Sequence, residues 1–393
     1  MTSEADALAA VLAKAGPCPV GRLPLLESLG RFSAGELWAH RPLPAFDNSA
    51  MDGYAVQAES CRAGARLRVM GEQPAGADRG LTISGGEAIR IFTGAPLPAG
   101  ADAVIMQEDV LREGEVIVAQ CAAKPGEFIR HTGSDLAMGQ KILARGEKIA
   151  PQTLALLASQ GVREIEVNGV PRVAIVSTGD EMALPGQTPR AGEIFESNSF
   201  MLEALVIAAG AEITRREHCR DDLEEMTKTF RRGLQSDALI VSGGVSVGDH
   251  DLVKPALRDL GGEIDLWRVA IKPGKPFLFG RAGECCIFGL PGNPVSAFIT
   301  FLKFVRPALL KMSGAAGESL GLRKVPARLA TEVMNDGERP HYLRGHLDDG
   351  VFALTGRQES HALFGLSRAN ALLRVAGGEK FPVNAIVPVE LLD

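Results

Sequence analysis

Three short apolar segments, each running directly into a glycine- or proline-rich polar loop, constrain this chain most. The apolar segments are residues 173–176, 238–241 and 285–290, and the loops after them are residues 177–181, 242–249 and 291–294. Uninterrupted apolar runs bounded by turn residues are typical of buried strands in a parallel sheet, where ligands bind beyond the carboxyl ends of the strands. Glycines in such loops let backbone N–H groups approach an oxyanion closely. The pattern therefore predicts an anion-binding site built from three loops.

The size and charge of the chain limit its class. With 393 residues it exceeds one ordinary domain, so we expect several domains. The apolar fraction of 46% and the charged fraction of 23% are usual for a globular protein. The net charge of -6 argues against a protein that binds nucleic acid through its phosphate backbone, so any phosphate recognition should be local.

The sequence also suggests a compartment. The cysteines are scattered and form no C-x-x-C pair, which suits a reducing environment. The first residues carry acidic charge where a signal peptide needs basic charge, and no apolar run approaches the ~18 residues of a membrane span. We therefore expect a cytoplasmic protein without a membrane segment.

The order of helix-like and strand-like segments along the chain predicts four domains. Helical periodicity with a possible Ser3 cap marks residues 4–14, and a second helix is expected around residues 153–159. Short β-like runs lie between them, and strands alternate with helical segments near residues 199–209, 223–234, 252–260 and 295–310. The predicted bounds are a discontinuous N-terminal and linker domain (1–44 and 138–170), an inserted β domain (45–137), a doubly wound α/β domain (171–315) and a C-terminal β barrel (316–393).

Two lysines form the first candidate cation pair. Lys272 and Lys275 lie three residues apart on a loop stiffened by Pro273 and Pro276, which would pre-organise their charges for an oxyanion. A solvated surface turn is the alternative. The neighbouring anion-type loops favour the functional interpretation.

Paired carboxylates occur in the same loops, at Asp180 and Glu181, Asp221 and Asp222, and Asp249 and Asp251. Oxygen ligands of this kind suit Mg²⁺, which takes one or two carboxylates together with substrate phosphates. Either Asp221 or Asp222 is alternatively the N-cap of the helix that follows. The chain has no His/Cys set with zinc spacing, which disfavours a zinc hydrolase.

The loop of residues 44–56 is polar and crowded, with Asp47, Asn48, Ser49 and Asp52 close together in sequence. It is either part of a site or a network of Asx turns that orders the loop. The histidines His131 and His250 flank candidate loops, but a single histidine is more often a surface residue without a role.

Six segments together resemble the molybdopterin molybdenumtransferase family, which includes MoeA and the gephyrin E domain. They are residues 47–55, 93–96, 177–181, 242–248, 271–276 and 289–296, in the family's order over nearly the whole chain. Each segment alone would be a weak signal. Their combination at matching spacing makes coincidence very improbable.

The resemblance implies a fold, a reaction and an assembly. The fold would be multidomain α/β plus β, with a central domain similar to the MogA-like molybdopterin-binding domains, an inserted small β domain, a helical linker domain and a C-terminal β barrel. The reaction would be Mg-dependent insertion of molybdate into adenylated molybdopterin with release of AMP. The assembly would be a homodimer whose cleft lies between the α/β domain of one subunit and the β domain of the other, with Asp52 and Thr93 acting in trans.

The resemblance also implies functional positions. The catalytic set would be Asp52, Asp135, Glu181, Asp221, Asp251, Lys272 and Lys275. Of these, Glu181, Asp221 and Asp251 would hold Mg²⁺. The substrate-binding set would be Thr93, Ser242, Gly243, Gly244, Ser246, Gly248, Arg268, Pro291, Gly292, Asn293 and Pro294. Arg268 stands where a well-known family member has a lysine, and would keep the charge with a different geometry.

Two other functions remain open from the sequence. A molybdopterin adenylyltransferase would share the α/β domain, but the additional β domains disfavour it. A non-catalytic scaffold like gephyrin is the second alternative. For the transferase, we expect transient contacts with the adenylyltransferase and with the recipient molybdoenzymes, and the sequence leaves molybdate and tungstate undistinguished.

Overall fold

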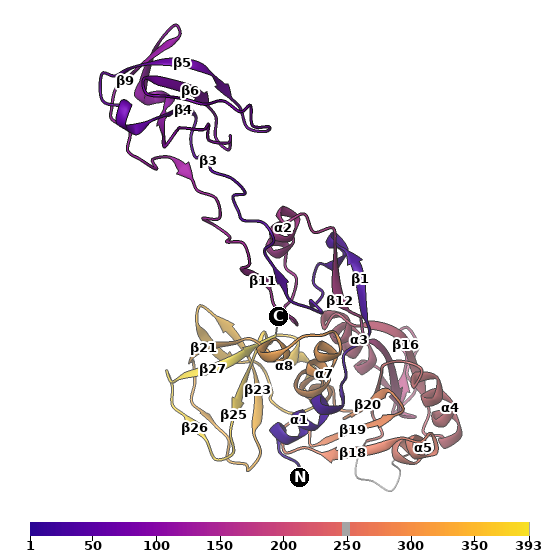
Figure 1. Ribbon diagram of the computed structural model, residues 1–393. Coiled ribbons are helices and arrows are strands. Elements are labelled where there is room, and N and C mark those ends of the chain that lie inside the picture. The colour runs from indigo at the N-terminus through magenta and orange to yellow at the C-terminus, as the bar shows by residue number, and fades with distance from the viewer. Residues whose placement is uncertain (246–251, 393) are drawn as a thin grey trace. The chain divides into compact units, whose positions relative to one another are not determined.

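The computed structural model describes residues 1–245 and 252–392, and the chain divides into two compact units (Figure 1). The first unit consists of Met1–Gly35, Arg145–Pro151 and Arg163–Asp393, and the second of Glu36–Ala144 and Gln152–Val162. The four-domain bounds expected from the sequence are finer than this division and stay a prediction.

A six-stranded sheet forms the centre of the first unit. Its order is β16 (Glu212–Cys219), β13 (Arg172–Thr178), β17 (Ala238–Ser242), β20 (Cys285–Leu290), β19 (Pro276–Ala282) and β18 (Glu263–Arg268). The first four strands are parallel, and they include all three apolar segments that the sequence singled out. β19 runs antiparallel to both of its neighbours, β20 and β18. The short turn between β19 and β20 cannot make a parallel crossover.

Helices cover both faces of this sheet, as expected for a doubly wound fold. Along β13, Val173 and Ile175 pack into one apolar core while Ala174 and Val176 pack into another. This alternation follows from the two-residue period of a strand. The first core contains α1 (Glu4–Lys14), α3 (Asn198–Ala208), α6 (Pro294–Thr300) and α7 (Arg306–Met312), and the second contains α4 (Leu223–Gly233) and α5 (Val253–Asp259).

The helix expected over residues 295–310 is interrupted. Between α6 and α7 lies a π-helical turn, η4 (Phe301–Val305), and the Arg306 N–H donates to the Phe301 carbonyl, five residues back. Pro307 follows directly and has no N–H to give to the preceding turn. The wider hydrogen-bond register accommodates this proline within the buried helix.

The C-terminal region of the first unit is a closed barrel, as predicted. Its strands are β21 (Lys324–Leu329), β24 (Val351–Leu354), β23 (His341–Asp348), β25 (Ala371–Val375) and β27 (Ile386–Leu391). Smaller elements of this unit are β1 (Val20–Pro24) with β12 (Glu164–Asn168), β14 (Met182–Ala183) with β15 (Ile194–Phe195), β22 (Val333–Met334) with β26 (Lys380–Phe381), the helix α8 (Leu363–Leu366), and the 3-10 turns η1 (Leu25–Ser28) and η5 (Gly317–Leu320).

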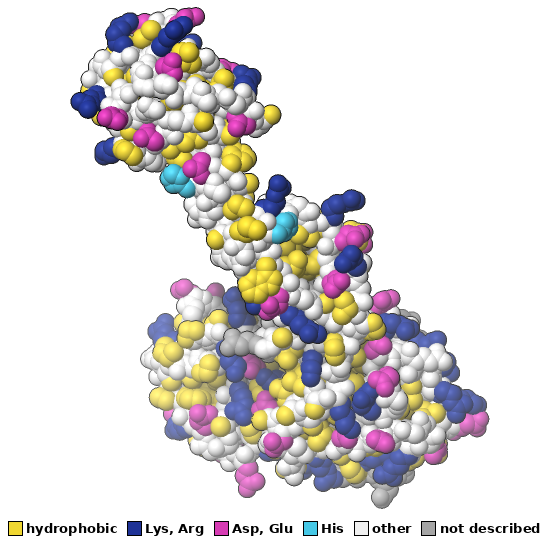
Figure 2. Space-filling view, in the orientation of Figure 1, with side chains coloured by type: hydrophobic (Ala, Val, Ile, Leu, Met, Phe, Trp, Pro, Cys, Tyr) yellow, Lys and Arg dark blue, Asp and Glu magenta, His cyan; other side chains and the backbone are white. Residues whose placement is uncertain are grey.

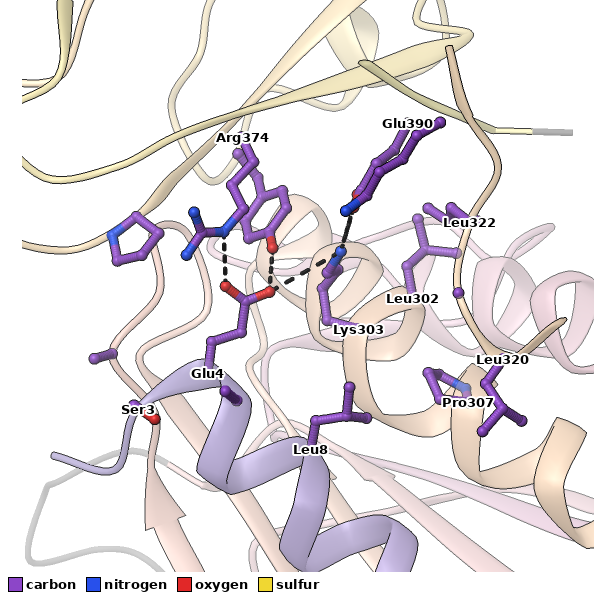
Figure 3. A pocket seen from close by; sticks show the side chains of 16 residues that line it. Ser3, Glu4, Leu8, Leu302, Lys303, Pro307, Leu320, Leu322, Arg374 and Glu390 are labelled. Carbon is purple, nitrogen blue, oxygen red and sulfur yellow. Dashed lines mark hydrogen bonds and ion pairs between the residues drawn. The ribbon is translucent and has the colours of Figure 1, made fainter. Parts of the chain in front are cut away.

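A cavity of about 500 Å³ marks the place where the N-terminal helix meets the barrel (Figure 3). The α1 residue Glu4 accepts hydrogen bonds from the Tyr342 hydroxyl and, at 2.9 Å, from Arg374 Nε. Beside it, Lys303 Nζ lies 2.8 Å from Glu390 Oε1. These paired charges attach α1 and η4 to the barrel.

The second unit is built on another six-stranded sheet. Its order is β7 (Ala103–Met106), β4 (Gly53–Val56), β6 (Glu87–Ile91), β5 (Arg66–Gln73), β9 (Val116–Ala119) and β8 (Val110–Glu113). Two-stranded pairs join β3 (Asn48–Ser49) to β10 (Ile129–Arg130) and β2 (Leu37–Trp38) to β11 (Lys141–Leu143). The remaining elements are α2 (Pro151–Ser159), which confirms the expected second helix, and the turns η2 (Ala58–Ser60) and η3 (Gln107–Asp109).

Candidate functional site

The carboxyl ends of β13, β17 and β20 open into a cleft of about 400 Å³. Parallel neighbours place the loops that follow them at one edge of the sheet, which is the usual ligand site of an α/β fold. Of the residues expected at the site, the cleft is lined by Glu181, Asp221, Ser242, Gly243, Gly244, Pro291, Gly292 and Asn293. The three-loop arrangement predicted from the sequence is therefore present.

The loop after β17 requires glycine at two positions that line the cleft. Gly243 and Gly244 have φ values of 95° and 65°, which side chains rarely adopt. A Cβ on Gly243 would lie 2.8 Å from the Thr178 carbonyl oxygen, and one on Gly244 would lie 2.8 Å from Val253 Cγ2. The backbone of this loop is therefore in close contact with β13 and α5.

Carboxylates gather at one wall of the cleft. The Asp221 N–H donates to Asp180 Oδ1 at 3.3 Å. Desolvation, and then the negative charges of Asp180 and Glu181, raise the pKa of Asp221. Neighbouring carboxylates that disfavour each other's ionisation are a suitable environment for a divalent cation. Residues 1–245 and 252–392 contain no group of three or more His, Cys, Asp or Glu side chains arranged to hold a metal ion.

The structure separates the roles of two adjacent aspartates. Asp222 is the N-cap of α4, where its Oδ1 accepts from the Glu225 N–H at 2.8 Å. Asp221 does not cap the helix and lines the cleft instead. The capping alternative therefore applies to Asp222, and Asp221 stays available for a ligand.

The lysine loop is held by its backbone. The Lys272 N–H donates to the Pro340 carbonyl and the Tyr342 N–H donates to the Lys272 carbonyl, both at 2.8 Å, so the barrel fixes the loop. Lys272 and Lys275 are exposed and do not line the cleft. Arg268 and Pro294 do not line the cleft either. Arg268 Nε is buried and has no hydrogen-bond partner in the described part of the chain, and Pro294 begins α6.

The remaining expected residues of the β domain belong to the second unit. Thr93 donates both its N–H and its hydroxyl to Asp52 Oδ1, at 2.8 and 2.9 Å. The Thr93 N–H is the main cause of the lowered pKa of Asp52, followed by the Thr93 hydroxyl. Asp135 is exposed in the same unit.

The polar loop of residues 44–56 is ordered by local hydrogen bonds. Asn48 Nδ2 donates to the Phe46 carbonyl at 3.1 Å, and the Ser49 hydroxyl donates to the Met51 carbonyl at 2.6 Å. Asp47 accepts from the N–H and hydroxyl of Thr132, which lower its pKa to about 2 together with His131. The turn-network interpretation thus describes Asn48 and Ser49, while Asp52 faces Thr93.

Three expected site residues, Ser246, Gly248 and Asp251, lie outside the described residues, as do Asp249 and His250. Their roles stay predictions from the sequence.

The structure adds residues that the sequence did not indicate. Thr178, Glu196 and Asn198 line the cleft and are buried. The Thr178 hydroxyl has no hydrogen-bond partner in the described part of the chain. Glu196 and Asn198 lie at the start of the apolar helix α3 and in none of the segments that carried the resemblance, so no sequence signal assigned them to the site.

Acidic and basic side chains are interspersed on the face drawn in Figure 2, without a continuous basic surface. Within the described ranges, no helix is both long enough and apolar enough to cross a membrane.

Three family models match nearly the whole chain. The MoeA N-terminal region (domain I and II) matches residues 2–161, the probable molybdopterin binding domain matches residues 174–311, and the MoeA C-terminal region (domain IV) matches residues 326–392. The order of these models is that of the resemblance stated above.

Curated proteins and solved structures agree with these models. A molybdopterin molybdenumtransferase of Haemophilus influenzae is 35% identical over 91% of this chain and 90% of its own length, and one of Nostoc sp. is 36% identical over 90% and 84%. The crystal structure of a molybdopterin biosynthesis moeA protein from Pyrococcus horikoshii OT3 superposes with a TM-score of 0.87 at 30% identity, covering 100% of both chains. This chain therefore belongs to the molybdopterin molybdenumtransferase (MoeA) family.

Proposed function

We propose that this protein is a molybdopterin molybdenumtransferase, which inserts molybdate into the dithiolene of adenylated molybdopterin and releases AMP in a Mg-dependent reaction. Membership of the family supports the activity. The observation that carries the proposal is the cleft after β13, β17 and β20, where a close-packed glycine loop faces the carboxylates of Glu181 and Asp221. This combination suits a substrate with a phosphoanhydride and a divalent counter-ion.

The donor set on the cleft wall fits Mg²⁺. Glu181 and Asp221 would hold the ion together with Asp251, which the sequence assigns to the same set. Desolvation, and then the negative charges of Asp180 and Glu181, raise the pKa of Asp221, and a bound cation would offset both effects. When bound, Mg²⁺ would neutralise charge on the phosphoanhydride.

The other groups of the proposed reaction act by position and charge. The backbone of Gly243 and Gly244 would cradle a phosphate, since no side chain keeps it at a distance. Lys272 and Lys275 would neutralise molybdate or the charge that develops on the leaving AMP. No covalent nucleophile is required for such a transfer.

The expected surroundings of the protein belong to the same proposal. They are a homodimer, in which Asp52, Thr93 and Asp135 would contribute from the β domain, a cytoplasmic location, and transient contacts with the adenylyltransferase and recipient molybdoenzymes. Sedimentation equilibrium of the purified chain tests the dimer directly.

The proposed activity is tested by AMP release from adenylated molybdopterin with purified protein and Mg²⁺, with and without molybdate, coupled to reactivation of a molybdenum-free apoenzyme. We expect AMP release that depends on molybdate and on Mg²⁺, followed by reactivation.

Other outcomes identify the alternatives. ATP consumption with adenylated pterin as the product would indicate an adenylyltransferase. Binding of adenylated molybdopterin without AMP release or reactivation would indicate a scaffold.

A further inference from the structure

The beginning of α3 lies against the cleft, and its first residue, Asn198, lines it. Glu196 is 3% exposed and accepts from the Ser199 N–H at 2.8 Å, and it also accepts from the Ser199 hydroxyl. Glu196 thus binds the first turn of the helix, and the Asn198 amide bonds to the cleft loops instead.

The Asn198 amide links two of the three cleft loops. Its Nδ2 donates to the Gly292 carbonyl at 2.7 Å and to Ser242 Oγ at 3.0 Å. The carbonyl of Gly292 can only accept a hydrogen bond, so the amide nitrogen, not the amide oxygen, must face it. The orientation of the amide is therefore fixed by chemistry, and its second N–H reaches Ser242.

This orientation determines the polarity of the Ser242 hydroxyl. Because Ser242 Oγ accepts from Asn198, its own proton must be donated elsewhere. Within residues 1–245 and 252–392 this proton has no acceptor, and Ser242 lines the cleft immediately before Gly243. A buried donor without an acceptor among the described residues is suited to an oxyanion that arrives with a ligand.

We infer that Asn198 is a positioning residue that holds the loops after β17 and β20 together and directs the Ser242 hydroxyl proton toward a phosphate oxygen of the ligand. The inference rests on the proposed function, because the phosphate would be that of the adenylated substrate. The group that contacts the ligand is Ser242, and Asn198 acts through it.

The first test is equilibrium binding of inorganic pyrophosphate to the full chain in the presence of Mg²⁺. We expect Ser242→Ala to raise the Kd for pyrophosphate about tenfold, because it loses a hydrogen bond to a charged group. Asn198→Ala should raise the same Kd about fivefold, because the Ser242 hydroxyl remains but is no longer oriented. The double variant Asn198→Ala, Ser242→Ala should bind about as weakly as Ser242→Ala alone, since Asn198 has nothing left to orient.

Ser199→Ala is the matched control. It removes a hydrogen bond at the same helix start but leaves both cleft contacts of Asn198 in place. We expect it to lower the thermal midpoint without changing the Kd for pyrophosphate. Weakened binding in this control equal to that of Asn198→Ala would assign the effect to the helix start and overturn the inference.

Three further results would overturn it: no measurable binding of pyrophosphate to the wild-type chain, an unchanged Kd in Asn198→Ala, or effects of the two single variants that multiply in the double variant. In the transferase assay, we expect Asn198→Ala to raise the KM for adenylated molybdopterin while kcat changes less than about twofold. A wild-type chain that binds pyrophosphate but transfers no molybdenum would refute the proposed function, and the binding series would still decide the role of Asn198.

Discussion

At the scale of single residues, two adjacent aspartates have different roles: one caps a helix and the other lines the cleft. Asp222 binds the Glu225 N–H at the start of α4, and Asp221 faces the cleft beside Asp180 and Glu181. The sequence could not distinguish them, because a one-residue shift of the helix start exchanges their roles. The hydrogen bond from the Glu225 N–H to Asp222 identifies Asp222 as the cap.

This division makes opposite predictions for the two positions. Asp221→Asn keeps the size of the side chain and removes one charge. We therefore expect half-maximal AMP release to need a Mg²⁺ concentration about tenfold higher than in the wild type. Asp222→Ala should instead lower the free energy of unfolding by about 1 kcal/mol, with an unchanged Mg²⁺ requirement. Titration of activity with Mg²⁺ and urea unfolding measure the two effects. A normal Mg²⁺ requirement in Asp221→Asn would remove this residue from the proposed metal site.

At the scale of elements, the loop after β17 depends on backbone conformations that only glycine adopts readily. Gly244→Ala would place a Cβ 2.9 Å from Thr178 Oγ1 and 2.8 Å from Val253 Cγ2, at a φ of 65°. We expect this variant to raise the KM for adenylated molybdopterin about tenfold, because the loop must move away from β13 and α5.

Gly261→Ala separates conformational strain from this close contact. Gly261 also has a positive φ, 75°, but nothing lies within 4 Å of its hypothetical Cβ. The control should lower the free energy of unfolding by about 1 kcal/mol and leave the KM unchanged. Equal KM values for Gly244→Ala and the wild type would contradict the proposed role of the loop.

Several elements were predictable because their signals are local. The apolar periodicity and Ser3 cap of α1 depend on neighbours in sequence, and the structure has Ser3 Oγ accepting from the Asp6 N–H at 3.1 Å. The break at η4 and the antiparallel pair of β18 and β19 were not predicted. Both depend on how the segment packs against distant parts of the chain, which local propensity does not record.

At the scale of the whole molecule, His341 connects the stability of the barrel to the lysine loop. This histidine on β23 is 9% exposed and forms a parallel bridge with Lys272. Desolvation, followed by the positive charges of Lys272, Arg344 and Arg339, lowers its pKa from 6.5 to about 4, while Asp336 acts in the opposite direction. Protonation of His341 would add a buried charge among cations.

The stability consequence follows from the sign of this shift. Between pH 6.5 and about pH 4 the unfolded chain binds a proton at this position that the folded chain does not, so stability is lost as the pH falls through this range. The contribution is at most about 3 kcal/mol. We expect His341→Gln to reduce the decrease in thermal midpoint between pH 7.5 and pH 4.5.

His346→Gln is the control, because His346 lies on the same strand but is exposed. It should retain the acid sensitivity of the wild type. If His341→Gln loses stability with falling pH as steeply as the wild type, the buried histidine is not the source.

The sequence by itself determined the family, the parallel strands and the loops that line the cleft, because each signal lies in contiguous residues whose chemistry is local. It indicated Ser242, Gly243, Gly244, Glu181 and Asp221 in this way. Only the tertiary structure decided which aspartate caps α4, that the barrel fixes the lysine loop, and that Asn198 joins two cleft loops. These depend on hydrogen bonds between residues far apart in sequence, such as the Asn198 bond to the Gly292 carbonyl, and a bond of that kind exists only once the sheet brings its strands together.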